Sequence, residues 1–178
     1  MRRLLLALSL AALSSSFAGC NFPTVVPEAL NTEFKPTGEV LLYNRSISFD
    51  QVRVRSPICN LSKRTDGSWA GTFNNQPIDV SVTDSRITGV NVTMTREMSE
   101  GNKVIITGQF QGRIYRFELD DQQAMIRAPA KSMNLVGKHV AERETTYGPQ
   151  GNLQLRGDAG SIDTSWPQLA FALMTLMQ

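Results

Sequence analysis

The alternation of apolar and polar side chains is the feature that most constrains how this chain folds. It is clear at Ile78, Val80 and Val82, where Asp79 and Ser81 lie between the apolar residues. The same alternation recurs at Val52 and Val54, at Val90, Val92 and Met94, at Tyr115, Phe117 and Leu119, and at Leu153 and Leu155. Successive side chains of a strand point to opposite faces, so this period of two predicts antiparallel strands with one buried and one wet face.

Short groups of turn-forming residues separate these apolar runs. They are Asp66-Gly67, Asn74-Asn75, Asp84-Ser85, Gly101-Asn102, Asp120-Asp121 and Gly148-Pro149. Gly, Pro, Asn and Asp favour tight turns, so many of the strands should form hairpins. We therefore expect one mainly β domain over residues 38–178. It should be an antiparallel meander of about eight to ten strands that forms a small barrel or a sandwich.

A faint internal repeat supports this expectation. A shift of 37 residues places Trp69, Gly71 and Phe73 on Ile106, Gly108 and Phe110, and places Ile78, Val80 and Val82 on Tyr115, Phe117 and Leu119. Each copy has the pattern of one hairpin, with a glycine in the middle of its first strand. Such a glycine often marks a bend, and bends at matching places would help a sheet curl into a barrel. Chance similarity between two amphipathic hairpins is the alternative.

The last residues predict a short helix at about 165–177. Ser165 can cap it, Trp166-Pro167 suits its first turn, and Leu169 to Met177 is almost wholly apolar. A helix that is apolar on all sides is usually buried, so we expect it to plug or cover the sheet. At about a dozen residues it is too short to span a bilayer.

The first 19 residues have the layout of a secretory signal peptide. Arg2 and Arg3 are followed by the apolar run Leu4 to Leu13 and then by small residues up to Gly19. The Phe17-Ala18-Gly19-Cys20 end resembles the lipobox of bacterial lipoproteins, with Phe17 where leucine is usual. The resemblance implies cleavage before Cys20, a lipid on the Cys20 thiol and export to the cell envelope. In a Gram-negative bacterium the anchor would lie in the outer membrane.

Residues 20–37 would then be the lipidated N-terminus and an extended spacer, since prolines recur there without a clear period. An arm packed along the domain is the alternative. A further alternative is cleavage after Ala18, which would free the Cys20 thiol to pair with Cys59, the only other cysteine. Under the lipoprotein interpretation, Cys59 is instead a lone buried thiol.

The charge composition argues against nucleic acid as a partner. Arg2 and Arg3 account for the whole formal charge of +2, and the rest of the chain has 16 basic and 16 acidic residues. Nucleic-acid binding depends on clustered Lys and Arg. Arg53 and Arg55, with Lys63 and Arg64 nearby, suggest at most a small anion or headgroup site, and a solvated basic face is the simpler interpretation.

Catalytic, cofactor and metal signatures are absent from the sequence. His139 is the only histidine, which excludes multi-histidine metal sites, and no motif supports His139 in a triad or paired with Cys59. The remaining candidates are carboxylates, and each has a simpler structural explanation. They are Asp120-Asp121 and the pair Glu142 and Glu144 for acid–base chemistry, and Asp158 with Asp163 for calcium.

The segment Gly67-Ser68-Trp69, followed by hairpins and a C-terminal helix, weakly resembles the lipocalin and calycin pattern. That resemblance implies an up-and-down barrel that carries hydrophobic ligands. We expect a membrane-anchored, non-enzymatic envelope lipoprotein whose β-domain binds a small apolar ligand, a lipid or a protein, without a cofactor. A structural or assembly subunit of an envelope complex is the alternative, followed by a carboxylate-based hydrolase. The sequence assigns no residue to a ligand.

Overall fold

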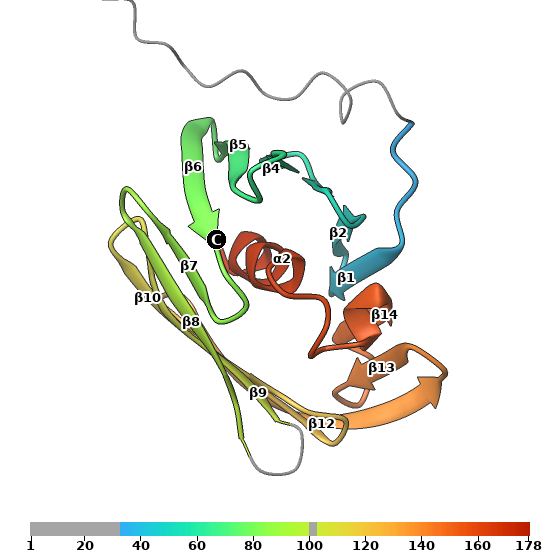
Figure 1. Ribbon diagram of the computed structural model, residues 1–178. Coiled ribbons are helices and arrows are strands. Elements are labelled where there is room, and N and C mark those ends of the chain that lie inside the picture. Colours follow the sequence, from blue (N-terminus) through green and yellow to red (C-terminus); the bar gives the residue numbers. More distant parts are fainter. Residues whose placement is uncertain (1–32, 100–102) are drawn as a thin grey trace, which may run out of the picture.

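The computed structural model describes residues 33–99 and 103–178, which form a closed barrel of fourteen antiparallel strands (Figure 1). Each strand pairs with the next along the chain, and β1 closes the barrel by pairing with β14. The strands are β1 (Gly38–Leu42), β2 (Arg45–Phe49), β3 (Arg53–Arg55), β4 (Cys59–Lys63), β5 (Trp69–Phe73), β6 (Gln76–Val82), β7 (Arg86–Gly89), β8 (Val92–Met98), β9 (Val104–Phe110), β10 (Arg113–Leu119), β11 (Gln123–Ala128), β12 (Lys131–Ala141), β13 (Glu144–Tyr147) and β14 (Leu153–Gly157).

The mainly β, antiparallel meander is therefore confirmed, and it forms a barrel, not a sandwich. Fourteen strands occur where about eight to ten were expected. The difference comes from strands too short to show a period of two. The clearest case is β3, which has three residues and pairs with β4 from Arg53↔Ser62 to Arg55↔Asn60.

Helix α2 (Gln168–Leu176) lies inside the barrel, as Figure 1 shows. Every residue from Leu169 to Leu176 is buried. The prediction of a buried C-terminal helix is thus confirmed, although the helix begins three residues later than expected. Ser165 does not cap it: no side-chain cap bond is formed, and the buried Ser165 hydroxyl has no partner in the described structure. A short 3₁₀ helix, η2 (Asp158–Gly160), connects the last strand to this region.

Polar contacts fix both ends of α2. At its start, the Gln168 side chain donates to the carbonyl oxygens of Asp50 and Gln51, at 3.3 and 3.2 Å. At its end, the Arg45 guanidinium donates to the carbonyl oxygens of Thr175 and Leu176, at 3.3 and 3.2 Å. A cation at this position satisfies carbonyl groups that have no partner within the helix and complements the negative end of the helix dipole.

The barrel has two ends, which we name by the turns they carry. The entry end holds the beginning of β1, the beginning of α2 and the turns 50–52, 64–68, 83–85, 120–122 and 142–143. The far end holds the end of α2 and the turns 43–44, 56–58, 74–75, 90–91, 111–112, 129–130 and 148–152. Because all strands run antiparallel, each turn belongs to one end only.

The internal repeat corresponds to two matching hairpins, β5–β6 and β9–β10. Gly71 and Gly108 occupy equivalent places and have nearly the same unusual backbone torsion, φ +149° and +155°. A Cβ atom at either place would lie 2.0 Å from a carbonyl oxygen of the neighbouring strand, that of Asn60 or Thr93. Both hairpins also close with two-residue turns whose residues have positive φ. The mid-strand glycines therefore mark places where neighbouring backbones approach closely.

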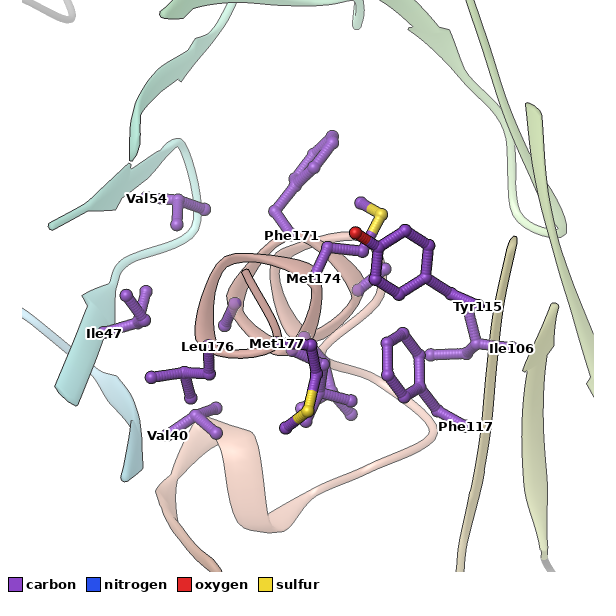
Figure 2. Close-up of a cluster of buried hydrophobic side chains, with 14 of the residues drawn as sticks. Val40, Ile47, Val54, Ile106, Tyr115, Phe117, Phe171, Met174, Leu176 and Met177 are labelled. Atoms are coloured by element: carbon purple, nitrogen blue, oxygen red, sulfur yellow. The ribbon is translucent and has the colours of Figure 1, made fainter. Parts of the chain in front are cut away.

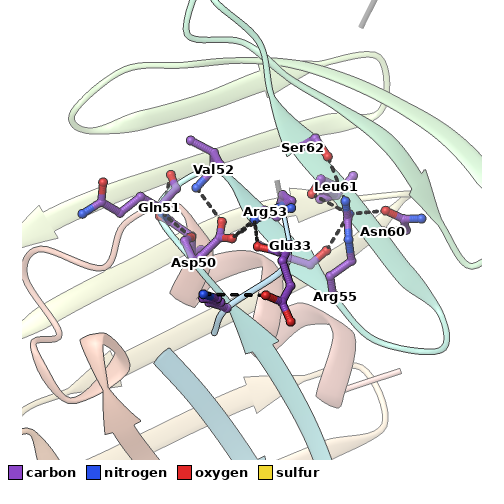
Figure 3. A network of polar contacts seen from close by, with 12 residues as sticks. Glu33, Asp50, Gln51, Val52, Arg53, Arg55, Asn60, Leu61 and Ser62 are labelled. Atoms are coloured by element: carbon purple, nitrogen blue, oxygen red, sulfur yellow. Dashed lines mark hydrogen bonds and ion pairs between the residues drawn. The ribbon is translucent and has the colours of Figure 1, made fainter. Parts of the chain in front are cut away.

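The predicted signal peptide and Cys20 lie outside the described residues, so the leader, the lipid and a Cys20–Cys59 bridge stay predictions. The last residues of the predicted spacer contact the barrel. The Glu33 carbonyl accepts a hydrogen bond from Arg53 at 3.1 Å, and the Phe34 ring centroid lies 5.3 Å from the Arg53 guanidinium (Figure 3). In the described part of the chain, no helix has the length and hydrophobicity needed to cross a bilayer.

Candidate functional site

The lumen, where a lipocalin-like carrier would hold its ligand, is filled with side chains. Figure 2 shows residues of α2 packed between opposite walls of the barrel. Trp69 packs on Phe171 of the helix with ring centroids 5.7 Å apart, and Phe73 meets Phe110 edge-on at 4.5 Å. All four side chains are at most 1% exposed. Close-packed aromatics at these positions are the arrangement expected of a structural core, not of a carrier's cavity.

A cleft of about 700 Å³ lies in the wall of the barrel, where β6 and β7 are offset. β6 has seven residues, but only Val80 to Val82 pair with β7. Its first four residues, Gln76 to Asp79, extend past the end of β7 at Gly89. Pro77 is one of these four and has no backbone N–H, which suits a strand edge without a neighbour. The offset leaves a gap between β6 and the far-end turns 90–91 and 111–112.

The walls of the cleft are mainly apolar with a few hydrogen-bonding groups. The apolar lining residues are Ala70, Pro77, Ile78 and Val90. The amide side chains are Gln76, Asn91 and Gln111, and the remaining lining residues are Gly71, Arg64 and Asp79. The Gln111 N–H donates to the Asn91 carbonyl at 2.8 Å, which joins the two turns into one wall.

An ion pair fixes the charged side of the cleft. Arg64 donates to both carboxylate oxygens of Asp79, at 2.8 and 2.9 Å. The Arg64 side chain is 11% exposed and that of Asp79 59%. Two parallel hydrogen bonds hold the carboxylate in a fixed orientation. Of the described residues that line the cleft, Asp79 is the one acid, and its oxygens are occupied by Arg64. The cleft therefore offers an apolar surface and hydrogen bonds, with no paired carboxylates for acid–base chemistry.

The structure does not bring the histidine and cysteine candidates together. His139 lies on β12 and is exposed. Cys59 begins β4 and is buried, and its thiol is within hydrogen-bonding reach of Thr175 of α2. Cys59 is free and buried among the described residues, which do not include Cys20, so the alternative of a Cys20–Cys59 bridge is not tested.

The carboxylate candidates have structural roles or lie apart. Asp120 accepts the backbone N–H groups of Gln122 and Gln123, at 2.8 and 2.7 Å, which explains its place in the β10–β11 turn. Glu142 and Glu144 do not lie on the same strand: Glu142 is in the turn and Glu144 begins β13. The Glu144 carboxylate accepts from Arg156 at 3.2 Å.

The calcium candidates do not form a site either. Asp158 pairs with Arg143 at 3.5 Å, and the backbone carbonyl of Asp163 accepts from Arg96. Among residues 33–99 and 103–178, no three His, Cys, Asp or Glu side chains are grouped closely enough to hold a metal ion.

The basic group on and near β3 is not a free anion site, and its interpretation as a solvated face is wrong for Arg53. The Arg53 guanidinium lies 2.7 Å from the Asp50 carboxylate, and both side chains are at least 90% buried (Figure 3). Arg55 donates to the Leu61 carbonyl and the Ser62 hydroxyl, at 3.0 and 3.2 Å. Arg64 is held by Asp79 in the cleft.

Cys59 gives a prediction for the pH dependence of stability. Burial raises the pKa of the Cys59 thiol to about 11, from an ordinary value of 9.0. The folded state therefore holds this proton more tightly than the unfolded state. The protonated Cys59 thiol therefore contributes to the free energy of unfolding below about pH 9, and this contribution is lost as the pH rises towards 11. Denaturant unfolding should show the stability of the wild type falling by up to about 3 kcal/mol more than that of Cys59→Ala across this window.

All Lys and Tyr residues are the same in the two proteins, so their contribution to the pH dependence cancels in the comparison. Equal slopes of stability against pH in the two proteins would contradict a raised pKa at Cys59.

The cleft was not predicted from the sequence, although one feature of the sequence is consistent with it. Pro77 stands inside an alternating run, which indicates a strand with a free edge. The residues opposite that edge, Val90 and Gln111, could be found only from the register of the barrel. Comparisons with family models, with curated proteins and with solved structures found no match.

Proposed function

We propose that this protein is a non-enzymatic binding protein of the bacterial cell envelope, held at a membrane by lipid on Cys20, whose barrel binds a small and largely apolar ligand in the cleft beside β6. The observation that carries the proposal is the cleft itself, at about 700 Å³ and with mainly apolar walls. Binding pockets for small molecules commonly have volumes of about 300 to 1,000 Å³, with a few polar groups to orient the ligand.

The filled lumen supports the cleft, and not the interior of the barrel, as the place where a ligand binds. A ligand inside the barrel would have to displace α2 or the aromatic side chains packed against it, all of which are buried. The cleft is open without such a change. Its amide groups would select the orientation of a ligand, while Ala70, Pro77, Ile78 and Val90 would supply apolar contact.

A pair of matched substitutions tests this function. Val90 and Val136 are 87% and 80% exposed, and only Val90 lines the cleft. We expect Val90→Asp to weaken the binding of an apolar probe about tenfold or more, because the new carboxylate would lose hydration beside the ligand. Val136→Asp, on β12, should leave binding unchanged.

The measurement is fluorescence titration of the mature chain, from residue 20 with Cys20→Ser, with N-phenyl-1-naphthylamine, followed by displacement with fatty acids. The serine removes the acyl chains that would otherwise bind the probe. The proposal fails if no saturable binding occurs, or if the two aspartate variants bind the probe equally well.

A structural or assembly subunit is the second candidate function, and the filled lumen favours it. A barrel whose interior is a packed core can act only through its outer surface. If the folded protein binds neither the probe nor fatty acids in the titration, the result favours this structural or assembly role.

A further inference from the structure

Charge is divided unevenly between the two ends of the barrel. We compare the far-end turns with the two strand residues on either side of each turn. In the described chain this far-end set contains five basic residues and no acidic one. The basic residues are Arg45, Arg55, Arg113, Arg127 and Lys131.

The entry end is different. Its turns and flanking residues mix both signs, and each of the five turns named above contains an acidic residue. Ion pairs connect many of them, such as Lys103 with Asp120 at 3.7 Å and Arg143 with Asp158 at 3.5 Å. The small net charge of the chain thus hides a difference between its two ends: the far end is basic, and the entry end has both signs.

The basic groups of the far end are not neutralised by carboxylates. None of the ion pairs among the described residues includes any of the five. Arg127 and Arg113 are exposed, and Arg113 donates to the Gln178 side-chain oxygen at 2.8 Å. Lys131 extends over the Tyr43 ring, with its ammonium nitrogen 5.9 Å from the ring centroid. Arg45, at the end of α2, and Arg55, which donates to Leu61 and Ser62, are largely used inside the fold.

Large apolar side chains stand out from the same end. Val90 and Ile114 are 87% and 75% exposed, and Tyr43 is 59% exposed. Tyr43 and Val90 lie in far-end turns, and Ile114 follows the turn 111–112 by two residues. Exposed apolar groups surrounded by Arg and Lys are the combination that binds the boundary between lipid headgroups and acyl chains.

We propose that the far end of the barrel docks on the surface of an anionic phospholipid bilayer. The far-end turns are staggered along the barrel, but those that carry the exposed groups adjoin in pairs. Lys131, beside the turn 129–130, covers Tyr43 of the turn 43–44, and a hydrogen bond joins the turns 90–91 and 111–112. A bilayer surface can therefore contact several of these groups at once. Arg and Lys would meet the phosphate groups, and Tyr43, Val90 and Ile114 would enter the headgroup layer. This contact is separate from the lipid predicted on Cys20. It shares Val90 with the cleft, whereas Tyr43, Ile114 and the five basic residues do not line the cleft, so variants of these residues test docking alone.

Each basic residue at the far end should strengthen binding to anionic vesicles by a similar factor. A Lys or Arg close to an anionic membrane surface strengthens binding roughly fivefold. Removal of two such charges should therefore weaken binding roughly 25-fold. The effect should shrink with added salt, because the attraction is screened over about 10 Å at moderate ionic strength.

The experiment is sedimentation of the mature chain, from residue 20 with Cys20→Ser, with vesicles. One set contains phosphatidylcholine alone, and the other contains equal parts of phosphatidylcholine and phosphatidylglycerol. We expect binding to the anionic vesicles only. The double variant Arg127→Gln with Lys131→Gln should bind roughly 25-fold more weakly. The matched control is Lys63→Gln with Arg86→Gln, two exposed basic residues of the entry end, which should bind like the parent.

Two further outcomes decide between a bilayer and a simple polyanion. Tyr43→Ser with Ile114→Ser should weaken vesicle binding as well, since these side chains would contact lipid. If this pair has no effect while the charge variants do, the surface binds polyanions in general and bilayer docking is overturned. It is equally overturned if the far-end and entry-end charge variants lose binding to the same extent, or if neutral vesicles bind as well as anionic ones. None of these results bears on probe binding in the cleft.

Discussion

A chain that ends at Thr164, without residues 165–178, is expected not to fold into the barrel. In helix α2, the side chains of Leu169, Phe171, Leu173, Met174 and Leu176 are all fully buried. Burial of a large apolar side chain contributes about 1.5 to 3 kcal/mol, so these five alone contribute on the order of 10 kcal/mol. That equals the whole net stability of a typical domain, which is about 5 to 15 kcal/mol.

The loss would extend beyond the helix itself. The lumen-facing side chains of the strands pack on α2, and without it they would line a space in contact with water. The strand ladder alone does not compensate for that exposure, because net hydrogen-bond contributions to stability are small. Near-ultraviolet circular dichroism and a denaturant titration of the truncated chain should show no fixed aromatic signal and no cooperative transition.

A single substitution in α2 tests the same loss of core packing on a smaller scale. Phe171→Ala removes the ring that packs on Trp69 and should destabilise the fold by about 3 to 5 kcal/mol. Val136→Ala, on an exposed part of β12, should change stability by less than about 0.5 kcal/mol. A truncated chain that stays soluble and unfolds cooperatively would show that α2 is a peripheral addition and not part of the core.

The sequence predicted this helix well because the evidence for it is local. An unbroken apolar run of helical length near the C-terminus can hardly be placed anywhere but in a core. The antiparallel meander could also be predicted, since alternation and turn residues are patterns that extend over only a few neighbouring positions. The first residue of the helix could not be predicted. Ser165 has the right chemistry for a cap, but its hydroxyl is buried and makes no cap bond.

Features that depend on register and closure could not be predicted. A three-residue strand such as β3 carries too few positions for a period, and it is a strand only because β2 and β4 lie on either side of it. The cleft arises from the offset between β6 and β7, which brings Val90 and Gln111 opposite Pro77. The charge division was hidden for the same reason. Acidic and basic residues are mixed along the chain, and only the up-and-down path of the strands leaves one end without acidic residues.

Gly108→Ala is expected to destabilise the barrel far more than Gly112→Ala, a glycine four residues away in the same hairpin. Gly108 has φ +155°, in a region that is nearly exclusive to glycine, and an added Cβ would lie 2.0 Å from the Thr93 carbonyl oxygen. Gly112 also has a positive φ, +76°, but a Cβ there would meet nothing within 4 Å. The pair therefore separates close backbone approach from torsional strain alone.

The expected magnitudes follow from that difference. Strain in the backbone costs about 1 to 3 kcal/mol and forced overpacking a similar amount, so Gly108→Ala should cost about 4 kcal/mol or more. Gly112→Ala should cost about 1 to 2 kcal/mol, the penalty of a left-handed alanine. Equilibrium unfolding in denaturant measures both. Similar costs for the two variants would contradict the tight approach of β9 to β8 at this point.

A second pair of glycines, Gly71 in β5 and Gly67 in the turn before it, extends the argument to the internal repeat. Gly71→Ala should cost as much as Gly108→Ala, since its Cβ would lie 2.0 Å from the Asn60 carbonyl oxygen. Gly67→Ala, with φ +86° and open space around it, is the matched control. Equal large costs at Gly71 and Gly108 would mean that the two hairpins use the same bend to curve the wall. Their sequence similarity would then reflect one structural requirement met twice, because only a residue without Cβ lets neighbouring strands approach this closely.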